Sequence, residues 1–197
     1  MGKYYAVKVG KVPGIYNTWD ECKENVDGYS GAVYKSFKTL EEAENFIGIG
    51  NSDLDESFIH EPYAFVDGSF NLSTKTYGFG GFIVDNSVKY PLSGSGQDEE
   101  MATMRNVAGE ISGSMAAIAK ALELGLDELT IYYDYKGIEA WVNGSYKANK
   151  PGTIAYRDYV REAMNKIDIK FVKVAAHTGI PGNEEADRMA KKAVGIE

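Results

Sequence analysis

The sequence predicts an α/β protein: a mixed β-sheet with helices on its faces, preceded by a smaller α+β unit. Strand-like and helix-like segments alternate over residues 1–47, and from residue 61 three apolar segments in hairpin order precede strand–helix–strand crossovers. Hairpins give antiparallel neighbours and crossovers give parallel ones, so the sheet is expected to be mixed. Gly, Ser and Asp dominate the stretch between, which is typical of a linker. We therefore expect two domains, 1–47 and 61–197, joined by a linker at 48–60.

In the smaller unit, each helix begins at a capping box, in which a Thr is followed three residues later by a Glu. The pairs are Thr18 with Glu21 and Thr39 with Glu42. Each pair satisfies two backbone N–H groups at a helix start. The expected strands are 3–9, 14–16 and 31–37, and the expected helices are 18–26 and 39–47.

In the larger unit, the longest helical pattern carries an apolar stripe that includes Val107, Ile111 and Ile118. Such spacing places these side chains on one face of a helix. Asn183 is a good N-cap for the last helix. The expected strands are 62–68, 78–85, 87–93, 128–134 and 169–175, and the expected helices are 101–124, 134–142, 153–167 and 183–194.

Composition and charge restrict the classes of function. The chain has 197 residues, 44% of them hydrophobic and 25% charged, and a net charge of −8. An acidic surface repels nucleic acid, but acids that converge on metal ions would leave the remaining surface less negative. No run of 18 apolar residues exists, so we expect no membrane span. The start of the sequence lacks the apolar core of a signal peptide, and a single cysteine cannot form an internal disulfide. We expect a cytoplasmic protein, monomeric by default.

Four carboxylates stand where the pattern of their element favours apolar residues. Asp67 and Asp134 each end an apolar strand, Glu110 lies mid-helix among Ala, Gly and Ile, and Asp187 lies one turn into the last helix. Taken singly, each has a structural explanation, because Asp before Gly starts turns, Glu favours helices and Asp suits a helix start.

Together, the four acids indicate a metal site. Buried carboxylates without counter-ions would repel one another and raise one another's pKa values. Hard divalent cations remove that repulsion, and oxygen-only ligands select Mg²⁺ or Mn²⁺ over Zn²⁺. Two such ions about 4 Å apart are the usual apparatus for displacement at a phosphodiester.

A histidine precedes the last of these acids in the segment HTGIPGNEEAD. His177 stands ten residues before Asp187 in a Gly- and Pro-containing loop. Histidine serves as a general acid, a general base or a metal ligand, but a lone loop histidine is also commonly just solvated. Both interpretations stay open from the residues alone.

The segments FVDGSF, VAGEISG, IYYDYKG and HTGIPGNEEADRMA occur in the order in which the type 1 ribonucleases H carry their motifs, and residues 62–195 resemble that family. The resemblance implies a mixed five-stranded sheet and hydrolysis of the RNA strand of RNA–DNA hybrids, leaving 3′-hydroxyl and 5′-phosphate ends. It also implies that Asp67, Glu110, Asp134 and Asp187 bind two Mg²⁺ ions, with Mn²⁺ as an alternative, and that His177 assists catalysis.

Residues 3–47 independently resemble the small hybrid-binding domain attached to many such enzymes. By this resemblance Tyr5, Trp19 and Tyr34 face the DNA strand, with Lys35 near a phosphate. Aromatic faces stack on bases and lysine neutralises phosphate, which agrees with that role. The alternative is that Tyr5 and Trp19 belong to the core of the unit.

Selection of a hybrid requires contacts to the 2′-hydroxyls of one strand only. The resemblance assigns these contacts to the backbone at Gly68 and Ser69 and to the side chain of Asn106. It assigns Trp141 to a channel for the DNA strand, although Trp141 could equally be core.

The sequence departs from the family pattern at several positions that bear on substrate grip. Arg105 and Val107 flank Asn106 where polar residues are frequent, and Tyr135 follows Asp134 where Ser is frequent. Two other interpretations remain: a hybrid-binding adaptor without activity, and a DNA-directed nuclease on the same fold. The four intact acids disfavour the first, and the Asp-Gly-Ser motif with the N-terminal unit disfavours the second.

Overall fold

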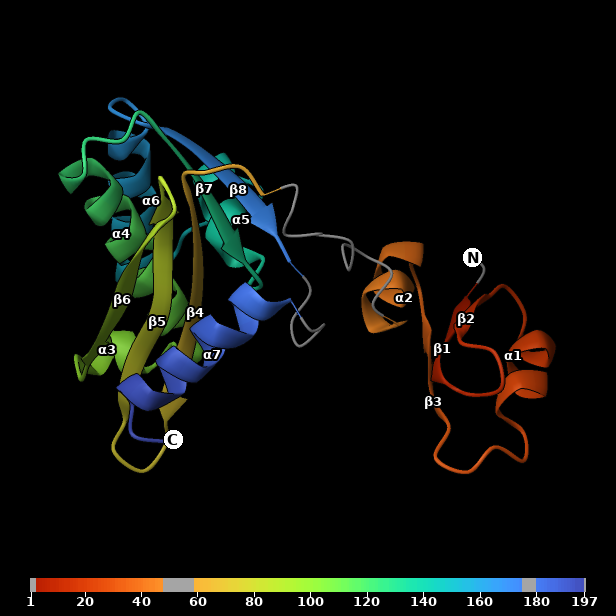
Figure 1. The fold of residues 1–197 in the computed structure, drawn as a ribbon. Coiled ribbons are helices and arrows are strands. Elements are labelled where there is room, and N and C mark those ends of the chain that lie inside the picture. Colours follow the sequence, from red (N-terminus) through yellow and green to blue (C-terminus); the bar gives the residue numbers. More distant parts are fainter. Residues whose placement is uncertain (1–2, 48–58, 175–179, 197) are drawn as a thin grey trace. The chain divides into compact units, whose positions relative to one another are not determined.

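The computed structural model describes residues 3–47, 59–174 and 180–196. The chain divides into two compact units, Met1–Asp55 and Glu56–Glu197, and Figure 1 shows the elements of each. The domain limits expected from the sequence stay a prediction. No helix among the described residues is long and apolar enough to cross a membrane.

The smaller unit is a three-stranded antiparallel sheet, in the order β2-β1-β3, with two helices. Its elements are β1 Tyr4–Val9, β2 Gly14–Tyr16, α1 Trp19–Val26, β3 Val33–Phe37 and α2 Leu40–Ile47. Both capping boxes are confirmed: at α1, the hydroxyl of Thr18 accepts a hydrogen bond from Glu21 N at 3.3 Å, and the carboxylate of Glu21 accepts one from Thr18 N at 3.2 Å. The Thr39–Glu42 pair repeats this exchange at α2.

The larger unit is a five-stranded mixed sheet, as the sequence predicted, and its strand order is β6-β5-β4-β7-β8. The strands β6, β5 and β4 pair antiparallel, and β4, β7 and β8 pair parallel. The elements are β4 Tyr63–Asn71, β5 Thr76–Asp85, β6 Val88–Gly96, α3 Glu99–Ala102, α4 Asn106–Glu123, β7 Glu128–Tyr133, α5 Gly137–Asn143, α6 Pro151–Ala163, β8 Asp168–Lys173 and α7 Pro181–Ala193.

The helices α4 and α7 cover opposite faces of this sheet, which Figure 1 shows as one helix behind and one in front. A Cβ placed on Gly68 would meet the backbone of α4 at Glu110, whereas one placed on Gly80 would meet α7 at Ala190. Successive residues of a strand face opposite sides, and Asp67 pairs with Gly80 across β4 and β5. Asp67 therefore points to the α7 face, while its neighbour Gly68 lets α4 approach on the other.

The helix expected at 101–124 is in fact two helices, so this prediction was wrong at its N-terminal end. The chain turns between α3 and α4 at Arg105, which has φ 53° and ψ −128°. This conformation belongs to the first central residue of a type II′ turn, a position dominated by glycine. An arginine there gives no sequence signal for the turn.

Helices α6 and α7 both begin earlier than expected, and each begins at a proline. Pro181 is the first residue of α7 and Ile180 is its N-cap, so the predicted capping role of Asn183 was wrong. Proline at the first helical position has its φ fixed at a helical value and lacks the N–H that would be unpaired there. Asn183 instead lies buried in the first turn, and its Oδ1 has no hydrogen-bond partner in the part of the chain that the structure describes.

Candidate functional site

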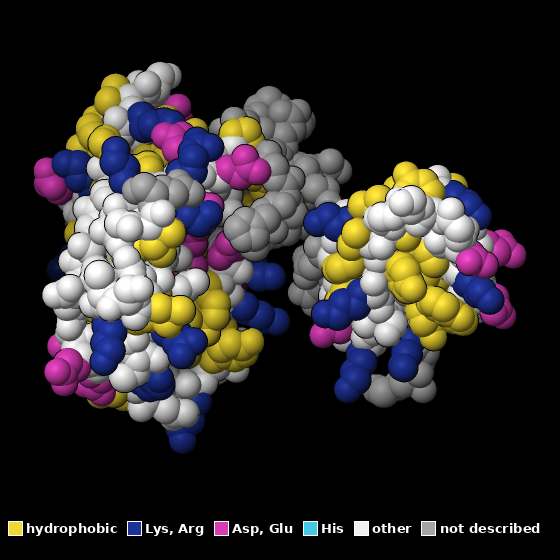
Figure 2. Space-filling model, turned by 90° about the horizontal axis from the view of Figure 1, so that it is seen from below, with side chains coloured by type: hydrophobic (Ala, Val, Ile, Leu, Met, Phe, Trp, Pro, Cys, Tyr) yellow, Lys and Arg dark blue, Asp and Glu magenta, His cyan; other side chains and the backbone are white. Residues whose placement is uncertain are grey.

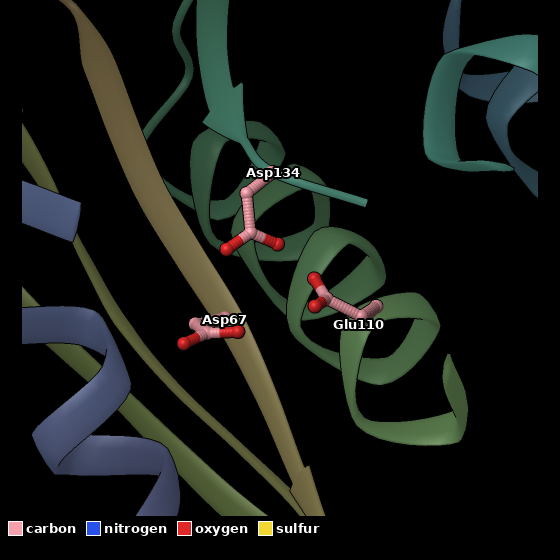
Figure 3. A group of neighbouring side chains, drawn as sticks. All are labelled: Asp67, Glu110 and Asp134. Atoms are coloured by element: carbon pink, nitrogen blue, oxygen red, sulfur yellow. The ribbon is translucent and has the colours of Figure 1, made fainter. Parts of the chain in front are cut away.

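Three acidic side chains from three different elements meet at one end of the parallel strands. Asp67 comes from β4, Asp134 follows β7 and Glu110 comes from α4, and Figure 3 shows their carboxylates gathered around one space. One carboxylate oxygen from each lies within 4.8 Å of those of the other two. The sequence predicted this convergence.

The pairing of β4 with β7 brings the two aspartates together. These strands run parallel with Phe65 opposite Tyr132. Two residues further along each strand direction, the same register places Asp67 beside Asp134. Both acids thus come directly after apolar residues and lie where the parallel pairing of β4 with β7 ends.

Close packing of a helix on a glycine brings in the glutamate. A Cβ on Gly68 would collide with Glu110 N, and one on Gly109 would collide with Gly78 O. Any larger residue at either position would push α4 away from the sheet. Gly68 and Gly109 therefore set how near Glu110 comes to Asp67.

Burial makes this cluster electrostatically unfavourable without a cation. Asp67 and Glu110 are 8% and 4% exposed. Burial, followed by repulsion from Asp134, raises the pKa of Asp67 to about 6. Burial, followed by repulsion from Asp134 and Asp67, raises the pKa of Glu110 well above its usual value. Glu110 Oε2 has no hydrogen-bond partner among the described residues, so it is free to bind a cation.

The fourth predicted acid lies on the wall of the same cavity but outside this tight group. A hollow of about 280 Å³, here called the acidic cavity, is lined by the three acids together with Asp187. Lys191, one turn further along α7, donates a hydrogen bond to Asp187 Oδ2 at 2.7 Å. Asp187 also contributes to the raised pKa of Asp67, so its charge is felt across the cavity.

The donor set of the acidic cavity fits a hard divalent cation. All the candidate ligand atoms are carboxylate oxygens, and oxygen ligands suit Mg²⁺ and Mn²⁺ rather than Zn²⁺. The unpartnered Oε2 of Glu110 is the kind of buried acceptor that such an ion would satisfy. Asp67, Glu110 and Asp134 could together hold one ion, with Asp187 available to a second.

Of the residues expected to contact RNA, Gly68 and Asn106 line the acidic cavity. Ser69 is buried in β4 next to Gly68. His177 lies outside the described residues. The structure adds Tyr135, which lines both the acidic cavity and a second hollow of about 380 Å³.

Trp141 proves to be both part of the core and part of a surface hollow. It is 8% exposed, and its ring centroid lies 5.8 Å from that of Tyr135. It lines the second hollow together with Lys147 and Lys150. These two lysines were not among the site residues expected from the sequence, although the basic character of their segment, GSYKANK, was a signal for them.

The smaller unit exposes an aromatic group made of Tyr5, Trp19 and Tyr34. Neighbouring ring centroids in this group lie 5.9 Å apart. Trp19 and Tyr34 are 42% and 45% exposed, so the alternative that Trp19 belongs to the core is wrong, whereas Tyr5 packs partly against the core. Lys35 is exposed on the adjoining strand β3. Figure 2 shows hydrophobic side chains gathered on the viewed face of this unit.

Two sequence families account for nearly all the described residues. The family described as RNase H matches residues 60–195, and the family described as Ribonuclease H1 N-terminal domain matches residues 3–47. The chain belongs to the ribonuclease H family. This confirms the resemblance seen in the sequence motifs.

Individual relatives agree with this assignment. The chain is 28% identical to ribonuclease H1 of Homo sapiens over 256 aligned positions, covering 98% of this chain and 89% of the relative. It is 55% identical to ribonuclease H of Saccharomyces cerevisiae over 52 residues. That second match covers only 26% of this chain and 15% of the yeast protein.

Solved structures confirm the fold of the larger unit. Ribonuclease H1 of Halobacterium salinarum superposes with a TM-score of 0.56 at 22% identity, covering 69% of this chain and 98% of that one. The LC11 ribonuclease H1, solved in complex with an RNA/DNA hybrid, gives a TM-score of 0.54 at 16% identity, covering 68% of this chain and 99% of that one.

Proposed function

We propose that the larger unit hydrolyses the RNA strand of RNA–DNA hybrids with the help of two divalent cations, leaving 3′-hydroxyl and 5′-phosphate ends. The observation that carries this proposal is the meeting of three buried carboxylates within 4.8 Å. Family membership supports this choice of substrate, as does the LC11 ribonuclease H1, which was solved in complex with an RNA/DNA hybrid.

Magnesium is the proposed cation, with manganese as an alternative, and Asp67, Glu110, Asp134 and Asp187 are the proposed ligands. Such ions, when bound, lower the pKa of an attacking water and stabilise the leaving oxygen. Asp67 is the acid best placed to serve both ions. Both Asp134, from the tight group, and Asp187, the fourth acid, raise the pKa of Asp67.

The residues around the acids would orient the two strands. Gly68 and Asn106 line the acidic cavity, and Ser69 follows Gly68 in β4. The backbone at Gly68 and Ser69 and the side chain of Asn106 would contact 2′-hydroxyls, which only the RNA strand carries. Trp141, with the lysines of the second hollow, would contact the DNA strand.

The smaller unit would tether the enzyme to its substrate. Exposed Trp19 and Tyr34 offer faces on which sugars or bases stack, next to Tyr5, and Lys35 offers a charge for a phosphate. Linking two binding units raises the effective concentration of the catalytic unit at the hybrid.

His177 would act as a proton carrier or aid product release. We further expect the protein to be a monomer that works in the cytoplasm.

The test is cleavage of an end-labelled RNA–DNA hybrid in Mg²⁺, with Asp134→Asn beside the wild type. Asp168→Asn is the matched control, because it makes the same chemical change at an exposed position, the start of β8, that lies outside the cavity. Cleavage of only the RNA strand, lost in Asp134→Asn and kept in Asp168→Asn, is the expected result. Tight binding without cleavage in Mg²⁺ and in Mn²⁺ would instead make the protein a hybrid-binding adaptor.

A further inference from the structure

Two buried hydrogen bonds connect three helices of the larger unit through a single tyrosine. The hydroxyl of Tyr156, on α6, donates a hydrogen bond to the backbone carbonyl of Ile138, on α5, at 3.1 Å. The hydroxyl of Ser114, on α4, lies 3.1 Å from the same tyrosine oxygen. We call Ser114, Tyr156 and the carbonyl of Ile138 the tyrosine bridge.

The donors fix the direction of both hydrogen bonds in the tyrosine bridge. A tyrosine hydroxyl carries one proton, and here that proton goes to the carbonyl of Ile138. Ser114 must therefore donate its own proton to the tyrosine oxygen. Burial raises the pKa of Tyr156, the hydrogen bond with Ser114 lowers it, and the charge of Glu110 raises it further. The phenol thus stays protonated, and the bridge lies close enough to the acidic cavity to feel one of its charges.

Each end of the tyrosine bridge lies four residues beyond an acid of the cavity. Ser114 follows Glu110 on α4, and residues four apart lie on the same face of a helix. Ile138 follows Asp134 at the same spacing, because only residues 134–136 separate β7 from α5. The tyrosine bridge therefore joins the two elements that position Glu110 and Asp134.

Apolar packing alone would hold these elements less firmly. Helix α6 packs against both α4 and α5, and the ring of Tyr156 meets that of Trp141 edge-on, with centroids 6.4 Å apart. Such packing is non-directional. A hydrogen bond weakens steeply when its length or angle changes. The two hydrogen bonds of the bridge therefore define where α4 and α5 stand relative to each other.

The two hydroxyls stand in a core that could be built without them. Ser114 and Tyr156 are each 0% exposed, and Tyr156 belongs to the same hydrophobic cluster as Ile118 and Val160. Alanine and phenylalanine at the two positions would need no hydrogen-bond partner there. A fully satisfied buried polar network makes a core rigid and specifies one arrangement of it. One fixed arrangement is what three carboxylates within 4.8 Å of one another require.

We propose that Tyr156 is a positioning residue for the acidic cavity. Through Ser114 and the carbonyl of Ile138, it holds Glu110 and Asp134 at the separation at which both can bind one cation, before any hybrid arrives. This inference rests on the proposed function, because it takes a divalent cation as the ligand of these acids. Tyr156 itself would contact neither the cation nor the hybrid.

The test compares two bridge variants with a control on the same helix. Tyr156→Phe removes the central oxygen and keeps the ring, and Ser114→Ala removes only the outer hydrogen bond, so it is the milder change. Val160→Ala is the matched control, because Val160 is also 0% exposed and lies one turn further along α6. It loosens the same core without touching the bridge.

Three measurements are made on the full chain at a temperature at which every variant is folded. Electron paramagnetic resonance follows Mn²⁺ binding without hybrid, using the part of the signal that Asp134→Asn removes. Cleavage of a labelled hybrid is followed over a range of Mg²⁺ concentrations. Thermal unfolding in EDTA reports the stability of each variant apart from any metal.

Tyr156→Phe should weaken Mn²⁺ binding and raise the Mg²⁺ concentration for half-maximal cleavage, each about 10-fold, an effect typical of losing a group that orients metal ligands. The KM for the hybrid should stay within about twofold of the wild type. Ser114→Ala should show a smaller loss, and the double variant should be no weaker than Tyr156→Phe, because both changes act through one bridge. Val160→Ala should melt at a lower temperature with unchanged Mn²⁺ affinity.

The outcomes separate this proposal from the proposed function. Unchanged Mn²⁺ affinity in a Tyr156→Phe protein that melts lower, or an equal loss of affinity in Val160→Ala, would make the bridge merely structural and leave the proposed function in place. A wild type that cleaves the hybrid but binds no Mn²⁺ in its absence would also overturn the bridge alone, since the acids would not be set in advance. If the wild type binds Mn²⁺ but does not cleave, the proposed function fails and the Mn²⁺ comparison still decides the bridge. Neither binding nor cleavage by the wild type would overturn both.

Discussion

The acidic cavity and the aromatic group of the smaller unit are built in opposite ways. In the cavity, carboxylates that prefer water are buried, with Glu110 only 4% exposed. In the smaller unit, aromatic rings that prefer burial are exposed, with Trp19 at 42%. Each arrangement is expected to cost free energy in the isolated protein, and a ligand that neutralises the acids or covers the rings would offset that cost. The difference fits the two ligands proposed above, cations for the cavity and the faces of nucleotides for the aromatic group.

The largest effect is expected from Asp67→Asn, which removes the acid that both proposed ions share. The cleavage rate should fall about 1000-fold, because loss of several kcal/mol of transition-state stabilisation corresponds to about three powers of ten. Single-turnover cleavage in Mg²⁺ measures this. In EDTA the same variant should melt at a higher temperature than the wild type, since one of the mutually repelling buried charges is gone. A variant that melts lower in EDTA would contradict the view that the acids destabilise the free protein.

The pH dependence of stability without metal is the second prediction. Folding raises the pKa of Asp67 to about 6, so the folded state binds protons more tightly than the unfolded state. This contribution is therefore fully present below pH of about 4 and is lost as the pH rises through about 6, a change on the order of 3 kcal/mol. Glu110 shifts in the same direction. Urea unfolding in EDTA at pH 4.5 and at pH 7 measures this. Between the lower and the higher pH, the free energy of unfolding should fall more in the wild type than in Asp67→Asn. Equal losses in the two proteins would contradict the shift.

The third prediction concerns the exposed aromatic group. Trp19→Ala should weaken hybrid binding about 10- to 100-fold, because stacking on one aromatic ring contributes about 1–3 kcal/mol. The free energy of unfolding should change by less than about 1 kcal/mol, since the side chain is half exposed. Tyr29→Ala is the control, as Tyr29 is 42% exposed and lies outside the aromatic group. An equal loss of affinity in the control would show that the group has no special role.

The smallest effect is expected from Lys191→Met. The Nζ of Lys191 lies 2.7 Å from Oδ2 of Asp187, so Lys191 would compete with a cation for that acid. The substitution should lower the Mg²⁺ concentration for half-maximal cleavage by a few-fold, because a partly exposed ion pair contributes up to about 1 kcal/mol. Lys192→Met, on the neighbouring exposed position of α7, should leave it unchanged. A higher Mg²⁺ requirement in Lys191→Met would mean that the lysine helps to bind the cation or its ligand.

The acidic cavity could be predicted from the sequence because its acids sit at positions set by strand and helix patterns. Asp134 follows β7, as expected, whereas Asp67 lies in the middle of β4, just beyond the residues that pair in parallel with β7, because β4 continues to Asn71 rather than ending at residue 68. Motif order then linked them to Glu110 and Asp187. What the sequence did not reveal was that Lys191 holds the last of these acids.

The break between α3 and α4 could not be predicted, because it depends on a backbone conformation that the residue type disguises. Sequence rules assign positive φ to glycine and asparagine, whereas Lys75 and Arg105 adopt it here. The same turn at Arg105 broke the helix that the apolar stripe extended back to residue 101. A local exception to propensity thus accounts for the error in the predicted fold.

The most direct test of the central claim uses a hybrid with a single phosphorothioate at the RNA linkage that the wild type cuts most. Sulfur is a poor ligand for Mg²⁺. If a cation in the acidic cavity contacts this phosphate, the enzyme should therefore cleave the modified linkage slowly in Mg²⁺. Mn²⁺, which tolerates sulfur better, should restore the rate toward that of the oxygen linkage. Slowing by the same factor in Mg²⁺ and Mn²⁺, or no slowing in either, would contradict a metal contact at the cleaved phosphate.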